Sequence, residues 1–257
     1  MKKISIWSFL ALAFFVLVSW GPEGHSTIAL IAQSHLTPQA KQAVEKILNN
    51  QPMSSISSYA DQYRETHPQT GDWHFLNLEL GLSQSQFKQF VLQQTKPNVY
   101  IEINKEIAEL SNPKTSKAQK KFDLEFLIHF VGDAHQPMHI SRAEDRGGND
   151  ITVTYDGKST NVHKIWDSLL LNDDQPDFTT LATKIDKATP TQIKKWQSDD
   201  IIQWLWESYQ ASSKVYANVH NGMILDHNYY LTNIKTAETR LEMGGIRLAG
   251  VLNKIYH

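Results

Sequence analysis

The sequence contains no cysteine among its 257 residues. A chain without cysteine has no disulfide, no thiolate nucleophile and no cysteine-based zinc finger, so any metal site must use His, Asp, Glu or backbone atoms. An excess of charge of one sign is also lacking, because 25 Lys and Arg oppose 27 Asp and Glu. This balance argues against a broad electrostatic surface for duplex nucleic acid. Histidine is abundant by contrast, with 11 residues.

Internal repeats, low-complexity tracts and Pro- or Gly-rich linkers are absent as well, which predicts a single domain. At the N-terminus, Lys2 and Lys3 precede an apolar run over residues 4–18. This pattern is typical of a secretory signal peptide and is short for a membrane span, with a retained membrane anchor as the alternative. We expect removal of residues 1–19, so that residues 20–257 form the mature domain.

Two further absences bear on the location of the protein. The sequence has no Asn-x-Ser/Thr glycosylation site, and it has no cysteine although the leader predicts export. Together these absences favour a bacterial protein that is secreted or periplasmic. We expect no membrane attachment once the leader is removed.

Most of the mature chain carries helical signals. Residues 151–162 are the main exception, because β-branched alternation around Asp156-Gly157 predicts a small hairpin near residues 150–162. Two long helices are predicted beyond Ser198. The predicted fold class is therefore all-α, a single mostly helical domain with one β-hairpin. Capping residues ahead of apolar residues at helical spacing are Thr37, Ser83 and Ser116.

The densest group of chemically useful side chains lies in the middle of the chain. His129 and Asp133 are four residues apart on a predicted helix and therefore share one face. His139 follows the end of that helix, and His163 and Asp167 repeat the four-residue spacing in an apolar and aromatic run. Buried His and Asp need partners, and a divalent cation would supply them. A structural network of His–Asp ion pairs is the alternative.

Three more polar residues in apolar settings are candidates for the same chemistry, namely His25, Asp61 and His74. His25 lies five residues after Trp20, the first residue expected after cleavage. The free amino nitrogen and the carbonyl oxygen of Trp20 would form a five-membered chelate around a metal. Cleavage would thus create a ligand that the precursor lacks.

Taken together, these segments resemble the zinc-dependent single-strand nuclease and 3′-nucleotidase family, the nuclease S-one/P-one family. The resemblance extends from Trp20 to Asp167, with a helical continuation to the end of the chain. The motifs that carry it are, in order, Trp20-Gly-x-x-Gly-His25, Ala60-Asp61-x-x-Arg64, Trp73-His74-Phe75, His129-Phe-x-Gly-Asp133-x-His-Gln-Pro-x-His139, Gly147-Gly148-Asn149 and Val162-His163-x-x-Trp166-Asp167.

The resemblance implies a fold of the phospholipase C and nuclease P-one type that holds three Zn²⁺ ions. It also implies that Asp61 orients or deprotonates the attacking water and that Arg64 stabilises the phosphate in the transition state. The implied ligands are Asp61, His74, His129 and a bridging Asp133 for the first ion, Trp20, His25 and Asp133 for the second, and His139, His163 and Asp167 for the third.

The implied substrates are single-stranded DNA and RNA, cut to 5′-phosphate products, and 3′-nucleotides. Phe75 would stack on a base, with Asn77 and Asn149 as polar partners and Gly147 allowing close approach. A stacking pocket accepts only an unpaired base, which favours single strands. Asn77 stands where part of the family has Asp, so the family's base preference does not transfer to this chain. No stable protein partner is expected.

Two other functions compete with the nuclease. A zinc-dependent phospholipase C is similar in fold and in its His-x-x-Gly-Asp core, but that family has Tyr and Asn where this chain has Phe130 and Arg142. A non-catalytic zinc-binding protein on the same fold is the other alternative. Asp61 and Arg64 argue against it, because zinc storage needs neither residue.

Overall fold

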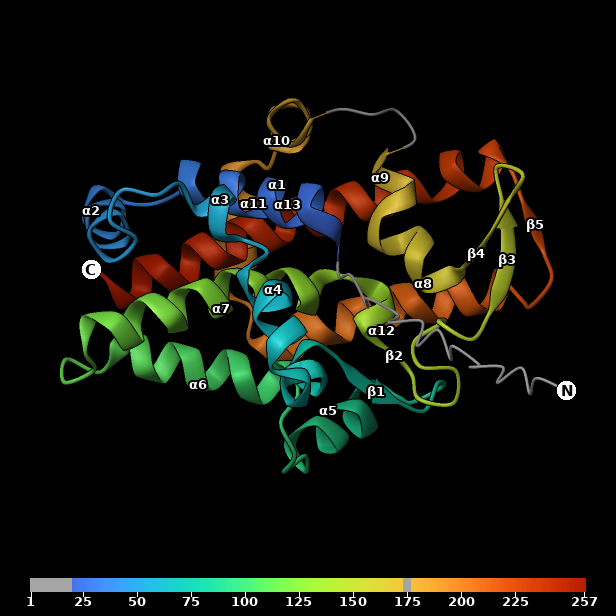
Figure 1. Cartoon of the computed structure of the whole chain (residues 1–257), viewed down its shortest axis with the longest axis horizontal. Helices are drawn as coiled ribbons and strands as arrows, with labels where there is room; N and C mark the ends of the chain where they lie inside the picture. Colours follow the sequence, from blue (N-terminus) through green and yellow to red (C-terminus); the bar gives the residue numbers. More distant parts are fainter. Residues whose placement is uncertain (1–19, 173–176) are drawn as a thin grey trace, which may run out of the picture.

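The computed structural model describes residues 20–172 and 177–257, so the predicted signal peptide lies outside the described part of the chain (Figure 1). The described residues are mostly helical, which confirms the predicted fold class. The longer helices are α1 (Gly21–Ser34), α2 (Pro38–Ile47), α4 (Tyr59–Thr66), α5 (Gln84–Leu92), α6 (Val99–Ser111), α7 (Lys117–His135), α10 (Phe178–Ile185), α11 (Pro190–Ser198), α12 (Ile201–Asn218) and α13 (His227–Ile255). The short helical segments are α3 (Met53–Ile56), α8 (Val162–Lys164), α9 (Leu170–Asn172), the 3₁₀ turns η1 (Pro68–His74) and η2 (Pro137–His139), and the π-helical turn η3 (Ile165–Leu169).

Helix α7 runs through the interior of the molecule, with α1, α6, α12 and α13 packed against it (Figure 1). Every residue from Asp123 to His135 is buried. A helix buried on all sides is expected to be apolar all round. His129 and Asp133 are exceptions on this helix, and both side chains are fully buried. Their burial is the first structural sign that they act together with partners.

The predicted helix starts are confirmed by their caps. The Thr37 side chain accepts a hydrogen bond from the backbone N–H of Ala40 at 3.2 Å, and Ser116 accepts one from Gln119 at 3.2 Å. Ser83 forms a capping box with Gln86 at the start of α5. Each cap satisfies an N–H that has no partner inside the helix. The two predicted C-terminal helices are α12 and α13.

Close contact between α1 and α13 ties the start of the domain to its end (Figure 1). Gly245 lies at this contact, because a Cβ added there would be 2.6 Å from the Cβ of Ile31. A side chain at position 245 would therefore push the two helices apart. This packing holds α1, and with it His25, against the interior of the domain.

The predicted hairpin is confirmed as strands β3 (Thr152–Tyr155) and β4 (Lys158–Asn161), which pair in antiparallel register. Its turn has positive φ at both Asp156 and Gly157, as a tight hairpin turn requires. Strand β5 (Ile224–Leu225) pairs in parallel with β3, which the sequence did not predict. Strand β5 has only two residues, and so short a segment shows no alternation of apolar and polar residues by which a strand could be recognised.

A second unpredicted pairing lies close to the histidine-rich segments. Strand β1 (Leu76–Leu78) pairs in parallel with β2 (Ile140–Arg142), with Asn77 opposite Ser141. Strand β2 follows directly on the candidate ligand His139, and β1 begins two residues after His74. The pairing therefore brings these two segments together, although 65 residues separate the two histidines. Among the described residues, no helix is both long and apolar enough to cross a membrane.

Candidate metal centre

Helix α7 supplies the first two residues of the centre. His129 and Asp133 lie one turn apart, with 3.3 Å between His129 Nε2 and Asp133 Oδ2. His74 joins them at the end of η1, its Nδ1 lying 2.9 Å from Asp133 Oδ2 and 3.1 Å from His129 Nε2. All three side chains are fully buried. The spacing in the sequence predicted that His129 and Asp133 share one face of the helix. The fold brings His74 to the same two side chains.

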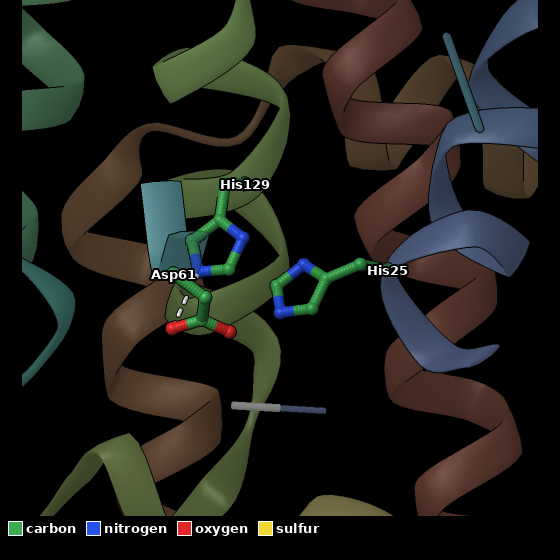
Figure 2. Close-up of side chains that lie close together, drawn as sticks. All are labelled: His25, Asp61 and His129. Carbon is green, nitrogen blue, oxygen red and sulfur yellow. Dashed lines mark ion pairs between the residues drawn. The ribbon is translucent and has the colours of Figure 1, made fainter. Parts of the chain in front are cut away.

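Two further residues reach the same point from α1 and α4. Figure 2 shows His25, Asp61 and His129 pointing toward one another, with an ion pair of 3.7 Å between His129 Nε2 and Asp61 Oδ1. The rings of His25 and His129 stack with their centroids 4.0 Å apart. The ligand atoms of these three residues lie within 4.8 Å of one another. The structure thus groups His25 with Asp61 and His129, whereas the family resemblance implies that His25 binds a different ion from the other two.

Asp133 connects these side chains because its two oxygens face different partners. Oδ2 faces His74 and His129, whereas Oδ1 lies 3.6 Å from His25 Nε2 and 3.6 Å from His139 Nδ1. A carboxylate oriented in this way can bind one cation through each oxygen. Bridging of two ions by Asp133 stays a prediction.

His139, His163 and Asp167 form a separate group. His163 Nε2 lies 3.2 Å from Asp167 Oδ2, and His139 Nε2 lies 3.7 Å from Asp167 Oδ1. Asp167 lies in the π-helical turn η3, directly after the short α8 that carries His163. Single π-helical turns are rare and concentrate at functional sites. The sequence predicted the pairing of His163 with Asp167 but not this turn.

Backbone carbonyls fix the protonated nitrogen of three of the histidines. Nδ1 of His129 faces the Ser57 carbonyl at 2.9 Å, Nδ1 of His139 faces the His74 carbonyl at 2.8 Å, and Nδ1 of His163 faces the Gly147 carbonyl at 2.8 Å. A carbonyl oxygen only accepts, so each Nδ1 carries the proton and donates it. In a neutral imidazole, Nε2 then has a lone pair and no proton.

Nε2 of His129 also lies 3.1 Å from Nδ1 of His74, whereas the Nε2 lone pairs of His139 and His163 point at carboxylate oxygens, which are also acceptors. Two acceptors at such distances repel each other unless a cation lies between them. Within the described residues, Nε2 of His139 and Nε2 of His163 make no hydrogen bond. Ligating histidines in metalloproteins commonly donate their other ring N–H to a carbonyl in this way. The residues present therefore fit metal ions, and they form three groups with suitable geometry.

Burial sets the protonation states of the groups. It lowers the pKa of His163 to about 3 and also lowers the pKa values of His74 and His139. These imidazoles are therefore neutral at pH 7, as ligands must be. Burial alone would raise the pKa of Asp133, but its histidine neighbours outweigh burial and hold that pKa well below its ordinary value. Burial raises the pKa of Asp167 well above its ordinary value, so this carboxylate needs a proton or another cation beside it.

Trp20, the remaining candidate ligand, begins the described chain and is fully buried. The next residue, Gly21, has φ of +61° and lies against the π-helical turn, where an added Cβ would be 3.4 Å from the Asp167 carbonyl oxygen. Gly21 thus places the first described residues beside the centre. Coordination by the Trp20 amino group stays a prediction.

Arg64 lies on α4 one turn after Asp61, with 3.0 Å between its Nη2 and Asp61 Oδ1. Both side chains are partly exposed, unlike the histidines around them. The charge of Arg64 also reaches His163, whose pKa it helps to lower, and Asp167, where it opposes the rise in pKa that burial causes. Asp61 and Arg64 therefore lie on the accessible side of the centre, where a substrate would approach.

The four predicted base-binding residues lie on two segments of the chain. Phe75 and Asn77 lie on the segment after His74 and are partly buried. Asn149 donates to the Arg146 carbonyl at 2.8 Å. Gly147 has φ of +65°, and its carbonyl accepts from His163, so its observed contact is with the centre. Their role in binding a base stays a prediction.

Gly132 and Gln136 belong to the long histidine motif without an expected role, and both support the centre directly. A Cβ at Gly132 would lie 2.5 Å from Nδ1 of His25, so only glycine lets this ring pack against α7. Gln136 is fully buried and hydrogen-bonded to Asp167. Glycine inside an apolar helix costs about 1 kcal/mol relative to alanine, and this cost is the signal that could have singled out Gly132.

Comparison with known proteins gives a consistent result. The model of the S1/P1 Nuclease family matches residues 20–257. Endonuclease 4 of Arabidopsis thaliana is 30% identical over 92% of this chain and 89% of its own length. Nuclease P1 of Penicillium citrinum is 30% identical over 92% of this chain and 98% of its own length. Endonuclease 2 of Arabidopsis thaliana is 28% identical over the whole chain and 96% of its own length.

Proposed function

The chain belongs to the S1/P1 nuclease family, and we propose that residues 20–257 form a zinc-dependent endonuclease that cuts single-stranded DNA and RNA to 5′-phosphate products and has 3′-nucleotidase activity. One observation carries the proposal. The buried histidines His129, His139 and His163 donate Nδ1–H to carbonyls and turn Nε2 toward carboxylates. This arrangement supports metal ions in place of a network of His–Asp ion pairs.

Zinc is the metal that suits these ligands best. Imidazole nitrogens with carboxylate oxygens are typical zinc ligands, and no cysteine is present to compete. Three ions are proposed, one for each ligand set that the family resemblance implies. The first would be held by Asp61, His74, His129 and Asp133, the second by Trp20, His25 and Asp133, and the third by His139, His163 and Asp167.

Bound zinc would supply Lewis acidity and a nucleophile that is available at neutral pH. Asp61 accepts a proton from, or orients, the attacking water, because its carboxylate lies at the accessible edge of the centre. Arg64 holds a phosphate oxygen through the guanidinium that lies 3.0 Å from Asp61. Negative charge develops on the phosphate in the transition state. A fixed cation beside it therefore stabilises the transition state more than it stabilises the bound substrate.

Phe75, Asn77, Gly147 and Asn149 are proposed to bind the base next to the cleaved bond. Phe75 follows the proposed ligand His74 directly and is partly exposed. A ring at this position would stack on an unpaired base and so favour single strands.

Export to the periplasm or the medium is part of the proposal. The family match begins at Trp20, the residue at which cleavage of the leader is expected. The mature chain would act there without a membrane anchor or a stable protein partner.

The proposal is tested on purified protein that begins at Trp20. We expect about three zinc ions per chain by elemental analysis, one for each of the three proposed ligand sets. We also expect release of 5′-mononucleotides from single-stranded DNA and RNA, and of phosphate from 3′-nucleotides, all stopped by a chelator. Asp61→Asn should lose nearly all of this activity.

Other outcomes would assign a different function. Phosphocholine released from phosphatidylcholine, without nucleotide release, would indicate a phospholipase C. Zinc with neither product would indicate a zinc-binding protein without turnover. An Asp61→Asn protein that cuts single-stranded DNA as fast as the wild type would falsify the role proposed for Asp61.

A further inference from the structure

Gln136 lies at the junction between α7 and the 3₁₀ turn η2 and is fully buried. All four of its polar groups are engaged. Its backbone N–H donates to the Asp133 carbonyl at 3.0 Å, and its carbonyl accepts from the His139 N–H at 3.1 Å. Its side chain contacts Met138 and Asp167. One residue therefore connects three candidate metal ligands, namely Asp133, His139 and Asp167.

The donor and acceptor ends of the Gln136 amide can be assigned without ambiguity. The backbone N–H of Met138 can only donate, so the side-chain atom that faces it is the oxygen Oε1. The NH₂ group must then be at the other end, where it donates to Oδ1 of Asp167. The cap on η2 thus fixes which end of the amide meets the carboxylate.

This hydrogen bond orients the Asp167 carboxylate relative to the two histidines of its group. With Oδ1 held by Gln136, Oδ2 faces His163 Nε2 at 3.2 Å, while Oδ1 still lies 3.7 Å from His139 Nε2. The two histidines are oriented by backbone carbonyls. For Asp167, the orienting partner is a side chain, and it can therefore be changed by mutation.

We infer that Gln136 is a positioning residue that sets the affinity and geometry of the metal ion held by His139, His163 and Asp167. The inference rests on the proposed function, because it takes this group to be a metal site. Outer partners of metal ligands typically change metal affinity by about 10- to 100-fold when they are removed. Loss of the amide leaves Asp167 free to rotate away from the two Nε2 atoms.

Two variants and a matched control test the inference. Gln136→Met keeps the length of the side chain and removes both hydrogen bonds, whereas Gln136→Glu keeps an acceptor for Met138 and loses the donor to Asp167. Gln119→Met is the control, since Gln119 also donates to an aspartate, Asp123 at 2.6 Å, but at the opposite end of α7. Each protein is equilibrated with zinc against graded chelator, and zinc per chain is measured.

We expect both Gln136 variants to release one zinc ion at about 10- to 100-fold lower chelator concentration than the wild type. The other zinc ions of the Gln136 variants, and all zinc ions of Gln119→Met, should be released at the same chelator concentration as in the wild type. Cobalt(II) substitution gives a second readout, because a changed carboxylate orientation alters the visible absorption of cobalt at this group. A defect in folding alone would not change one ion selectively.

The inference is overturned if the wild type and both Gln136 variants hold their ions with equal affinity and give the same cobalt spectrum. It is also overturned if Gln136→Glu binds the weakest ion more tightly, because charge would then matter and orientation would not. A wild type that binds no zinc or cobalt would instead overturn the proposed function itself. If Gln136→Met fails to fold, Gln136→Glu alone tests the inference, because its carboxylate still accepts the hydrogen bond from the Met138 N–H that caps η2.

Discussion

Gly132 illustrates how a residue without a side chain shapes the centre. It lies one position before Asp133 on α7, where the ring of His25 packs against the helix. An added Cβ would lie 2.5 Å from Nδ1 and 2.7 Å from Cε1 of this ring. Both distances are far shorter than van der Waals contact. His25 would therefore have to move away from Asp61, Asp133 and His129.

For Gly132→Ala we expect loss of the zinc ion that depends on His25 and a fall in nucleotide release of about tenfold or more. Alanine favours a helix over glycine, so a loss of helix stability would not explain the result. Gly244→Ala is the control, because an added Cβ there meets only side-chain atoms, at 3.3 Å or more. Unchanged zinc content and activity in Gly132→Ala would contradict this role.

At the scale of single residues, the sequence predicted which residues face each other along a helix. It did not predict how the histidine rings are oriented. The four-residue separations predicted that His129 would face Asp133 and that His163 would face Asp167, because a helix repeats every 3.6 residues. The Ser57 and Gly147 carbonyls come from distant segments, and any residue supplies a carbonyl. Nothing in the sequence therefore marked them as partners of histidines.

Between the elements α6 and α7 lies a buried pair of acidic side chains, Glu106 and Asp123. Burial raises the pKa of Glu106 to about 8, against the opposing charge of Lys105 and with the help of Asp123. Folded protein therefore keeps the Glu106 proton up to about pH 8, whereas the unfolded chain loses it near its ordinary pKa of 4.5. Between these values the unfolded state binds fewer protons, so the stability falls as the pH rises.

The substitution Glu106→Gln should abolish the fall in stability with rising pH, because glutamine has no proton to lose. We expect the variant to gain up to about 1.4 kcal/mol in free energy of unfolding, relative to the wild type, for each unit of pH between 5 and 8. Denaturant unfolding of chelator-treated protein measures the gain without a contribution from zinc release. Glu65→Gln, which neutralises an exposed carboxylate on α4, should show none. The prediction is wrong if the free energy of unfolding of Glu106→Gln changes with pH in parallel with that of the wild type.

Whole elements were predictable where their signals are local. Caps and apolar spacing identified α2, α5 and α7, because the residues that decide a helix start lie within a few positions of each other. The β1–β2 pair and the π-helical turn have no such signal. Strands of three residues pair here because the helices around them bring His74 and His139 together.

For the molecule as a whole, the candidate ligands join segments that are far apart in the chain. His25 on α1, Asp61 on α4, His74 on η1 and His129 on α7 meet at one point. Without ions, buried carboxylates face imidazole lone pairs, which is unfavourable. Metal ions should therefore contribute substantially to the stability of the entire domain.

Removal of zinc by a chelator should lower the melting temperature by about 10 °C or more. An ion present at a thousand times its dissociation constant adds about 4 kcal/mol, and each kcal/mol is worth about 2–4 °C in a domain of this size. Differential scanning calorimetry with and without chelator measures the change, and added zinc but not magnesium should reverse it. Equal melting temperatures would mean that the ions are not part of the folded structure.

The position of α13 also determines when the enzyme can be assembled. Every candidate ligand lies between Trp20 and Asp167, whereas the helix that packs against both α1 and α7 comes last, at His227–Ile255. A chain that emerges from its N-terminus thus presents all of its ligands before the element that holds two of their helices in place. We therefore expect the centre to be completed only after residues 227–255 have packed against α1 and α7.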